Sequence, residues 1–385
     1  MSKTIVNIID KGNPLPAYLF TKEVYSEGDR LLFISTREEA DSIELLKKQL
    51  QIPDDQVDSI IIKHDNDKVL YERICRIIKN KLDENQEYYV NLAGGSRYMA
   101  LSVQHVFEEF QSVYFYTQTR ENIIVKTIFD NSIYDDDDEI FPINYRMSLR
   151  EYFELYGLEH DLDVPKATVQ NASFAQHMFV LFSKKLLSNS DYQVLDILRK
   201  NYRNWNSINI AEVEQPEKFN MTAIPNLSKT LDYIGFIPKN NGVLMQDELE
   251  YLTGGWFEEY VFYMVNSLVK PEDIAIGVHI SSNGMKHNNE LDVSFIKANK
   301  LFVIECKTGV SSESLFNEIV YKVCAIKEVL LGTCNSYIFS LKNDFSGDWK
   351  KIANYMDISF CDYDIMTTKE MMKGVVEEII KIAGA

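Results

Sequence analysis

The sequence has few of the residues that build disulfide frameworks, zinc sites or membrane spans. Its five cysteines are scattered without a Cys-x-x-Cys pair, and its six histidines are equally dispersed. We therefore expect reduced thiols and no zinc centre. No apolar run approaches the ~18 residues of a membrane-spanning helix, and the first residues lack the apolar core of a signal peptide. These absences favour a cytoplasmic protein with no membrane partner.

Positive charge is also scarce. The chain carries 40 Lys and Arg against 58 Asp and Glu, a net charge of −18. This balance excludes a protein that coats nucleic acid through a broad basic face. It leaves open an enzyme that meets nucleic acid at one local site where a metal ion neutralises the acidic groups.

The first 130 residues alternate β-rich runs with amphipathic segments. We expect strands over 3–9, 30–35, 57–63, 87–93 and 112–118, with helices over 37–50 and 69–82 between them. Strands separated by helices predict a parallel, Rossmann-like sheet covered on both faces. After the fourth strand, Gly94 and Gly95 lead into a helix whose free backbone amides are suited to an anion.

The remainder divides into two parts. Residues 141–250 are expected to form a helical linker, with a helical pattern over 145–200. It ends in a winged-helix-like piece that turns through Asn240, Asn241 and Gly242. Residues 251–385 are expected to form an α/β domain.

The strongest chemical signal is the segment NELDVSFIKANKLFVIECKTG, residues 289–309. Its apolar alternation predicts two strands joined by a polar four-residue loop, 297–300. A hairpin centred between residues 298 and 299 sets Asp292 opposite Glu305, with Cβ atoms roughly 5 Å apart. Lys307 then projects from the same face as Glu305. Two carboxylates this close need a cation between them, and an oxygen-only ligand set suits Mg²⁺ or Mn²⁺. The alternative is an amphipathic hairpin whose charged face is solvated.

A helix over 254–268 precedes this hairpin and carries two adjacent acids. At 100° per residue, Glu258 lies about 80° from the centre of the apolar stripe and Glu259 about 180° from it. Glu258 is therefore expected near the metal, Glu259 in solvent, and Trp256 in the packed core.

These motifs resemble the PD-(D/E)xK nuclease of CRISPR-associated ancillary nucleases, which carry an N-terminal CARF (CRISPR-associated Rossmann fold) domain. The resemblance implies a restriction-endonuclease-like fold for residues 251–385. It assigns Glu258, Asp292, Glu305 and Lys307 to catalysis, with Asp292 and Glu305 as metal ligands. Lys322 falls where that family has a lysine on the following helix, as a candidate contact to substrate phosphate or, alternatively, a solvated lysine.

The segment NLAGGSRYM resembles the glycine-rich ligand loop of CARF domains, which implies such a domain over residues 1–140. The resemblance implies a homodimer that binds cyclic tetra-adenylate across its paired CARF domains. The residues that it places in the ligand pocket are Asp10, Gly12, Asn13, Thr36, Asn91, Gly94, Gly95, Ser96 and Arg97. A carboxylate at position 10 suits an adenine amino group or a ribose hydroxyl better than a phosphate.

The resemblance therefore predicts a metal-dependent nuclease of type III CRISPR antiviral defence, activated by a cyclic oligoadenylate. The substrates left open are single-stranded DNA, supercoiled DNA and RNA. Two alternatives compete with it. One is a ligand-responsive transcription regulator with a structural C-terminal module, and the other is an unregulated restriction-type endonuclease.

Overall fold

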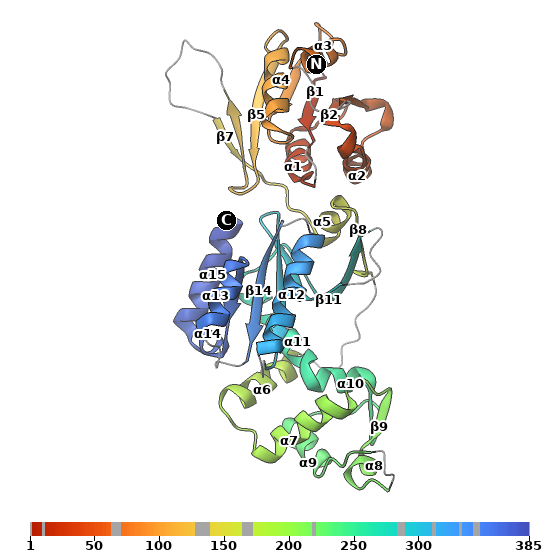
Figure 1. The fold of residues 1–385 in the computed structure, drawn as a ribbon, viewed down its shortest axis with the longest axis vertical. Helices are drawn as coiled ribbons and strands as arrows, with labels where there is room; N and C mark the ends of the chain where they lie inside the picture. Colours follow the sequence, from red (N-terminus) through yellow and green to blue (C-terminus); the bar gives the residue numbers. More distant parts are fainter. Residues whose placement is uncertain are drawn as a thin grey trace.

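Two large sheets and a group of helices that includes a small two-stranded sheet are stacked along one long axis of the protein (Figure 1). The structure is a computed structural model that describes residues 2–9, 12–62, 71–127, 139–163, 172–217, 221–282, 289–309, 313–330, 333–341 and 347–384. The N-terminal sheet lies at one end, the second sheet in the middle, and the helices of the linker at the other end. Among the described residues, no helix is both long and apolar enough to cross a membrane.

The N-terminal sheet has seven strands in the order β3-β2-β1-β4-β5-β6-β7. The first five pair in parallel, and β6 and β7 extend the edge antiparallel. The strands are β1 (Thr4–Ile8), β2 (Arg30–Thr36), β3 (Val57–Ile62), β4 (Tyr88–Asn91), β5 (Ser112–Gln118), β6 (Ile123–Thr127) and β7 (Glu139–Pro142). The helices between them are α1 (Leu15–Val24), α2 (Ala40–Leu50), α3 (Tyr71–Lys79) and α4 (Arg97–Phe107). Helices α1 and α2 pack into one apolar core, and α3 and α4 into another. The expected Rossmann-like sheet is confirmed.

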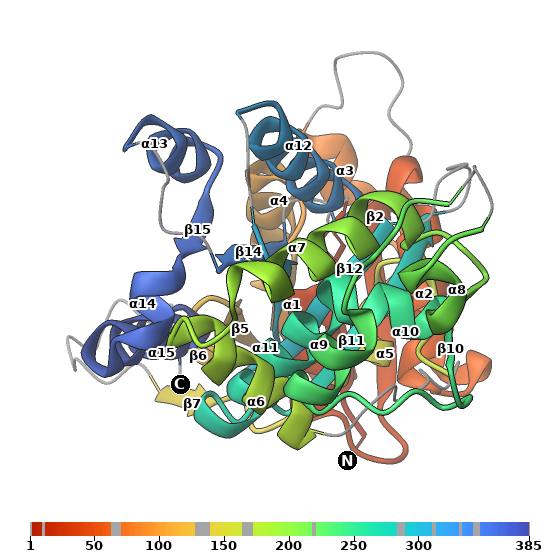
Figure 2. The same ribbon diagram turned by 90° about the horizontal axis from the view of Figure 1, so that it is seen from below.

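The helices of the linker gather at the far end of the molecule, where α6 to α10 lie together in the view from below (Figure 2). They are α6 (Ala172–Ser183), α7 (Asn189–Ile197), α8 (Ile210–Glu214), α9 (Leu227–Ile234) and α10 (Gln246–Glu250). Helices α7 and α10 are each followed by a π-helical turn, Leu198–Tyr202 after α7 and Tyr251–Gly255 after α10. A tight turn joins Asn240 to Val243, but strand β10 (Val243–Met245) pairs mainly with β9 (Ser207–Asn209). The predicted hairpin therefore consists of a single β-bridge between Asn240 and Val243. The partner of β10 in the small sheet is β9, which precedes α8 in the chain.

The second sheet has six strands in the order β15-β14-β13-β12-β11-β8. They are β11 (Asp273–Ser282), β12 (Asn289–Lys297), β13 (Lys300–Lys307), β14 (Cys334–Ser340), β15 (Ile358–Cys361) and β8 (Leu158–His160). Strand β8 corrects the helical prediction over 145–200, because this segment pairs with β11 instead of continuing the short helix α5 (Leu149–Leu155).

Helices cover both faces of the second sheet. Helix α11 (Trp256–Leu268) packs on one face in the core shared with the linker helices, and α12 (Glu313–Val329) covers the other. The chain ends in α13 (Gly347–Tyr355), α14 (Tyr363–Thr367) and α15 (Lys369–Ala383). All five cysteines are free thiols, as expected.

The two sheets share one apolar core. It contains Phe20 and Phe33 from the N-terminal domain, Tyr152 from α5, and Leu301 and Val303 from the second sheet. A movement of the N-terminal domain therefore has to repack side chains of the strands below it.

Candidate active site

The hairpin of β12 and β13 places two carboxylates opposite one another. Val293 pairs with Ile304 and Lys297 with Lys300, so the same register sets Asp292 against Glu305. This confirms the predicted centre of the hairpin. The loop is shorter than expected, because Ala298 and Asn299 alone make the turn with left-handed φ angles of 47° and 64°. That turn geometry matches the twist of the two strands.

Both carboxylates are buried. Asp292 is 4% exposed and Glu305 is 1% exposed. The alternative interpretation, an amphipathic hairpin with a solvated charged face, is therefore wrong. The backbone amide of Cys306 donates to Oδ2 of Asp292 at 2.8 Å. Burial and the negative charge of Asp292 raise the pKa of Glu305. Such a pair is unstable without positive charge beside it.

Two lysines supply that charge. The Nζ atom of Lys307 lies 2.6 Å from Glu305 and 3.4 Å from Asp292. Lys322 reaches in from α12, with its Nζ atom 2.7 Å from Oε2 of Glu305 and 3.5 Å from Asp292. The carboxylates raise the pKa of both lysines above the ordinary value, although burial acts against this. Lys322 is therefore a member of the cluster, and its alternative interpretation as a solvated lysine is wrong.

Helix α11 brings Glu258 to the same cluster. Burial, followed by the charges of Asp292 and Glu290, raises the pKa of Glu258 to about 8. The charges that shift its pKa belong to residues of the cluster, which supports the expected position of Glu258 beside the two carboxylates. The expectation for Glu259 was wrong, because its side chain is only 8% exposed and accepts a hydrogen bond from the Tyr251 hydroxyl. The wide turn before α11 folds Tyr251 back onto the helix, which helical phase alone does not reveal. Trp256 is 1% exposed and packs in the core, as predicted.

The donor set fits a hard divalent cation with few protein ligands. Among the residues that the structure describes, no three His, Cys, Asp or Glu side chains gather closely enough to hold a metal ion. Asp292 and Glu305 offer carboxylate oxygens on facing strands. Magnesium and manganese are commonly bound by one or two carboxylates, with water and substrate phosphate completing the shell. The residues present fit that arrangement.

The glycine-rich turn of the N-terminal domain lies between β4 and α4. Gly94 and Gly95 have φ angles of 133° and 63°, and a Cβ atom on Gly94 would lie 2.2 Å from the carbonyl oxygen of Ile8. The turn therefore packs directly on the end of β1, and only glycine fits. Ser96 caps α4 by accepting a hydrogen bond from Met99 N at 3.1 Å, and Ser96 and Arg97 are exposed. This is a helix start open to an anion.

The other residues that were expected to line the ligand pocket lie at the ends of the neighbouring strands. Asn91 is fully buried and accepts from Ala93 N at 3.2 Å, so it orders the turn from beneath. Thr36 forms a capping box with Glu39 at the end of β2. Gly12 and Asn13 follow β1, with Gly12 at a φ angle of 74°, and Oδ1 of Asn13 accepts from the Tyr156 hydroxyl at 3.4 Å. Asp10 lies outside the described residues.

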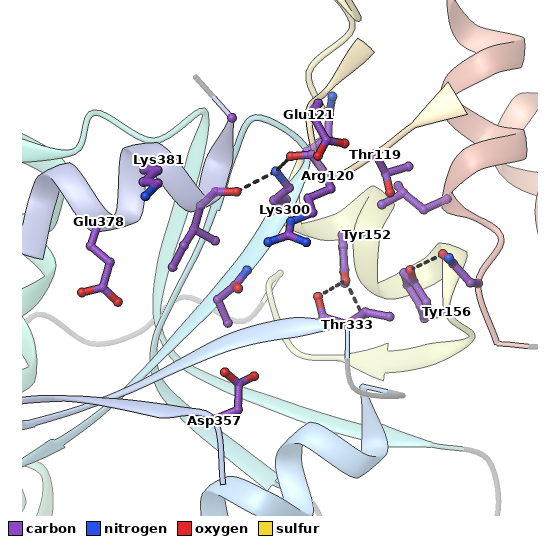
Figure 3. A pocket seen from close by; sticks show the side chains of 16 residues that line it. Thr119, Arg120, Glu121, Tyr152, Tyr156, Lys300, Thr333, Asp357, Glu378 and Lys381 are labelled. Atoms are coloured by element: carbon purple, nitrogen blue, oxygen red, sulfur yellow. Dashed lines mark hydrogen bonds between the residues drawn. The ribbon is translucent and has the colours of Figure 1, made fainter. Parts of the chain in front are cut away.

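A large pocket at the junction of the two domains was not foreseen. Its volume is about 980 Å³, and residues from both domains line it (Figure 3). Lys300 donates to the carbonyl oxygens of Arg120 and, at 2.7 Å, Ile382, and burial lowers its pKa to about 8. Tyr152 donates to Thr333, and Asn13 borders the same space. The lining comes from several separate segments, so no local pattern in the sequence marks it.

An N-terminal Rossmann-like domain with an open glycine-rich helix start is thus joined to a sheet with a carboxylate–lysine cluster, and this cluster is of a kind suited to a nuclease. Comparisons with protein families agree. The Card1 CARF domain matches residues 4–152, and the Card1-like endonuclease domain matches residues 246–352. The chain therefore belongs to the CRISPR-associated nucleases that join an N-terminal CARF domain to a C-terminal endonuclease domain.

Solved structures share the whole fold. The crystal structure of protein VC1899 from Vibrio cholerae matches with a TM-score of 0.74 at 15% identity, over 99% of both chains. Can2 from Sulfobacillus thermosulfidooxidans, in complex with cyclic tetra-adenylate, matches with a TM-score of 0.69 at 19% identity, over 100% of both chains. No protein with a curated description matches the chain in sequence.

Proposed function

We propose that this protein is a divalent-metal-dependent nuclease of type III CRISPR antiviral defence, activated by cyclic tetra-adenylate. The observation that carries the proposal is the buried pair Asp292 and Glu305, held between Lys307 and Lys322. Buried charges of this kind are costly for folding and are typical of sites that do chemistry. The match to an endonuclease domain gives the reaction class, hydrolysis of phosphodiester bonds.

Asp292 and Glu305 would hold Mg²⁺ or Mn²⁺. Such an ion supplies an activated water and stabilises charge on the phosphate under attack. Lys307 and Lys322 place two ammonium groups at the carboxylates, where they can face the negative oxygens of a phosphate. Glu258 adds a carboxyl group that releases its proton near neutral pH and can take up a proton in the site.

The activator is inferred from the CARF domain. The backbone at Gly94–Gly95–Ser96 and the exposed Arg97 offer local donors for phosphates, which a chain of net charge −18 needs. Can2, which matches over its full length, binds cyclic tetra-adenylate, and this supports the same ligand here. In a homodimer, two such loops would face one ring-shaped ligand.

The experiment is a cleavage assay with the full chain, Mn²⁺ or Mg²⁺ and labelled single-stranded DNA, supercoiled DNA and RNA. Cleavage should require the metal and stop with chelator. Asp292→Asn and Glu305→Gln keep the shape of each side chain and should abolish cleavage because each removes a ligand charge. The matched control is Glu370→Gln, which removes an exposed carboxylate on α15. Full activity of the Glu305→Gln protein would overturn the proposed site.

A regulator without nuclease activity is the remaining alternative from another class. The winged-helix-like pairing of β9 and β10 is the observation that favours it. It predicts ligand-dependent binding to duplex DNA with no cleavage under any metal condition, and the same assay distinguishes the two.

A further inference from the structure

Lys322 contacts both carboxylates of the candidate active site. Its Nζ atom lies 2.8 and 2.7 Å from the two side-chain oxygens of Glu305 and 3.5 Å from Oδ1 of Asp292. Within the described part of the chain, every hydrogen bond that Lys322 makes goes to these two residues. Its ammonium group therefore lies against the same oxygens that would hold a divalent cation.

The second lysine of the cluster is held differently. Lys307 belongs to β13 itself, and its Nζ atom also donates to the carbonyl oxygen of Cys306 at 3.1 Å. Lys322 comes from α12, and its side chain is 34% exposed, so its flexible stem can carry the ammonium into solvent without breaking another contact. A divalent cation on the carboxylates repels an ammonium on the same oxygens. Of the two lysines, Lys322 is the one that such an ion can displace.

Helix α12 extends from the nuclease sheet into the core that the two domains share. In its first half, Phe316 and Val320 pack in a core of the second sheet alone. Near its end, Ile326 and Val329 belong to the same core as Phe20 of the N-terminal domain. Close-packed side chains transmit a displacement to their neighbours. A change in the packing between the domains therefore acts on the helix that carries Lys322.

Polar and ring contacts join this end of α12 to the N-terminal ligand loop. Thr333 follows the helix, and its Oγ1 atom donates to the carbonyl oxygen of Leu330 at 2.6 Å. The Tyr152 hydroxyl donates to the same Oγ1 atom at 2.7 Å (Figure 3). The ring of Tyr152 lies 4.8 Å from that of Tyr156, whose hydroxyl donates to Oδ1 of Asn13 at 3.4 Å. Asn13 is one of the residues that were expected to line the ligand pocket.

We propose that Lys322 is an internal counter-ion of the metal site that a divalent cation has to displace, and that ligand bound to the CARF domain favours this displacement through α12. The inference rests on the proposed function and deepens it, since it states what the ligand changes at the nuclease site, namely the affinity for the metal. Coupling between two binding sites is reciprocal, so the metal raises the affinity for the ligand by the same factor.

The test measures binding of Mn²⁺ to the full chain by electron paramagnetic resonance of the free ion, with and without cyclic tetra-adenylate. Glu305→Gln should abolish binding at this site, and its titration with ligand present gives the Mn²⁺ that the ligand itself holds. In the wild-type protein we expect the ligand to tighten Mn²⁺ binding at least about fivefold. A calorimetric titration of the ligand should show the same factor when Mn²⁺ is added.

Lys322→Met tests the counter-ion directly, because it keeps the length of the side chain and removes the charge. Without ligand, this variant should bind Mn²⁺ at least about tenfold more tightly than wild type, since the site then carries one positive charge fewer. Ligand should change its Mn²⁺ affinity by less than about twofold. The matched control is Lys373→Met, which removes a lysine on α15 whose side chain is 75% exposed and should bind Mn²⁺ as wild type does.

Tyr152→Phe tests the connection to the ligand loop, because it removes the hydroxyl that contacts Thr333 and keeps the ring. It should bind Mn²⁺ as tightly as wild type without ligand and lose most of the increase with ligand. The control is Tyr355→Phe, at an 87% exposed tyrosine on α13. A full ligand effect in Tyr152→Phe would contradict the route through α12.

Two results would overturn the counter-ion and leave the nuclease function standing. One is wild-type Mn²⁺ affinity in a folded Lys322→Met protein, and the other is metal-dependent cleavage by a wild-type protein whose Mn²⁺ affinity the ligand does not change. The reciprocal shifts in the wild-type protein need no variant, so they decide the question even where a substitution disturbs folding. Absence of both Mn²⁺ binding and cleavage in the wild-type protein would remove the nuclease function and this inference with it.

Discussion

The side-chain amide of Asn299, in the turn of the nuclease hairpin, lies 2.9 Å from Oδ1 of Asn122 in the CARF domain. Asn299 is 1% exposed; it also donates to the Tyr145 carbonyl at 2.9 Å and accepts from Met147 N at 2.9 Å. The same two strands carry Asp292 and Glu305 seven and six residues from Asn299, roughly 20 Å away at the rise of a strand. The CARF domain therefore holds one end of the hairpin whose other end holds the carboxylates.

Replacing Asn299 should weaken the stimulation of the nuclease site by the ligand bound to the CARF domain. Asn299→Ala leaves buried partners without hydrogen bonds, which costs about 1–3 kcal/mol in the arrangement that contains them. We expect the ratio of stimulated to basal cleavage to fall about fivefold or more, while the CARF loop still binds the ligand. Asn241→Ala, in an exposed turn of the linker, is the control. Stimulation as in wild type would show that the hairpin does not carry the coupling.

Glu258 and Glu259 should separate chemistry from stability. Glu258→Gln is expected to slow cleavage at least about tenfold, because it removes a charge that interacts with Asp292 and Lys307. Glu259→Gln should keep most of the activity and lower the melting temperature by a few degrees, because it replaces the carboxylate that accepts from Tyr251. Single-turnover rates and melting curves of both variants provide the comparison. Equal losses of rate would contradict these roles.

The stability of the metal-free protein should depend on pH through Glu258. Its pKa is raised from the ordinary carboxyl value to about 8 by burial and by its acidic neighbours, so between these two pH values the folded protein binds more protons than the unfolded chain. The free energy of unfolding therefore falls as the pH rises from the ordinary pKa of a carboxyl group to about 8. Above about pH 8 the destabilisation by the ionised Glu258 is complete. The difference in melting temperature between wild type and Glu258→Gln, measured in chelator, should favour the variant increasingly from pH 5 to 8. A pH-independent difference would contradict the burial of this carboxyl.

Much of the fold and the central pair could be predicted because local periodicity determines them. The alternation around Asp292 and Glu305 fixes which residues face one another once the turn is placed. What could not be predicted depends on tertiary packing. Lys322 reaches Glu305 only because α12 packs on the neighbouring strand β14, and Glu259 is buried only because Tyr251 folds back onto α11. Strand β8 is too short to be predicted from its own sequence, because its pairing with β11 is what makes it a strand.

The ligand loop illustrates the same limit. A Gly-Gly turn before a helix predicts an anion site, but its tight packing on β1 appears only in three dimensions. A Cβ atom on Gly95 would lie 2.5 Å from Cγ2 of Ile8, so a larger residue there disturbs the fold as well as the ligand site. The exposed Arg97 is the better position for a functional test.

The measurement that tests the account most directly is a calorimetric titration of cyclic tetra-adenylate, run beside a cleavage assay with Mn²⁺ on the same protein. Ligand should bind and cleavage should rise over the same concentration range, because a ligand activates only if it binds one arrangement more tightly than the other. Arg97→Glu should move both curves to at least about tenfold higher ligand concentration while the maximal rate stays as in wild type, since the metal site is untouched. Tight binding of the ligand by the wild-type protein with no change in its cleavage rate would contradict the account.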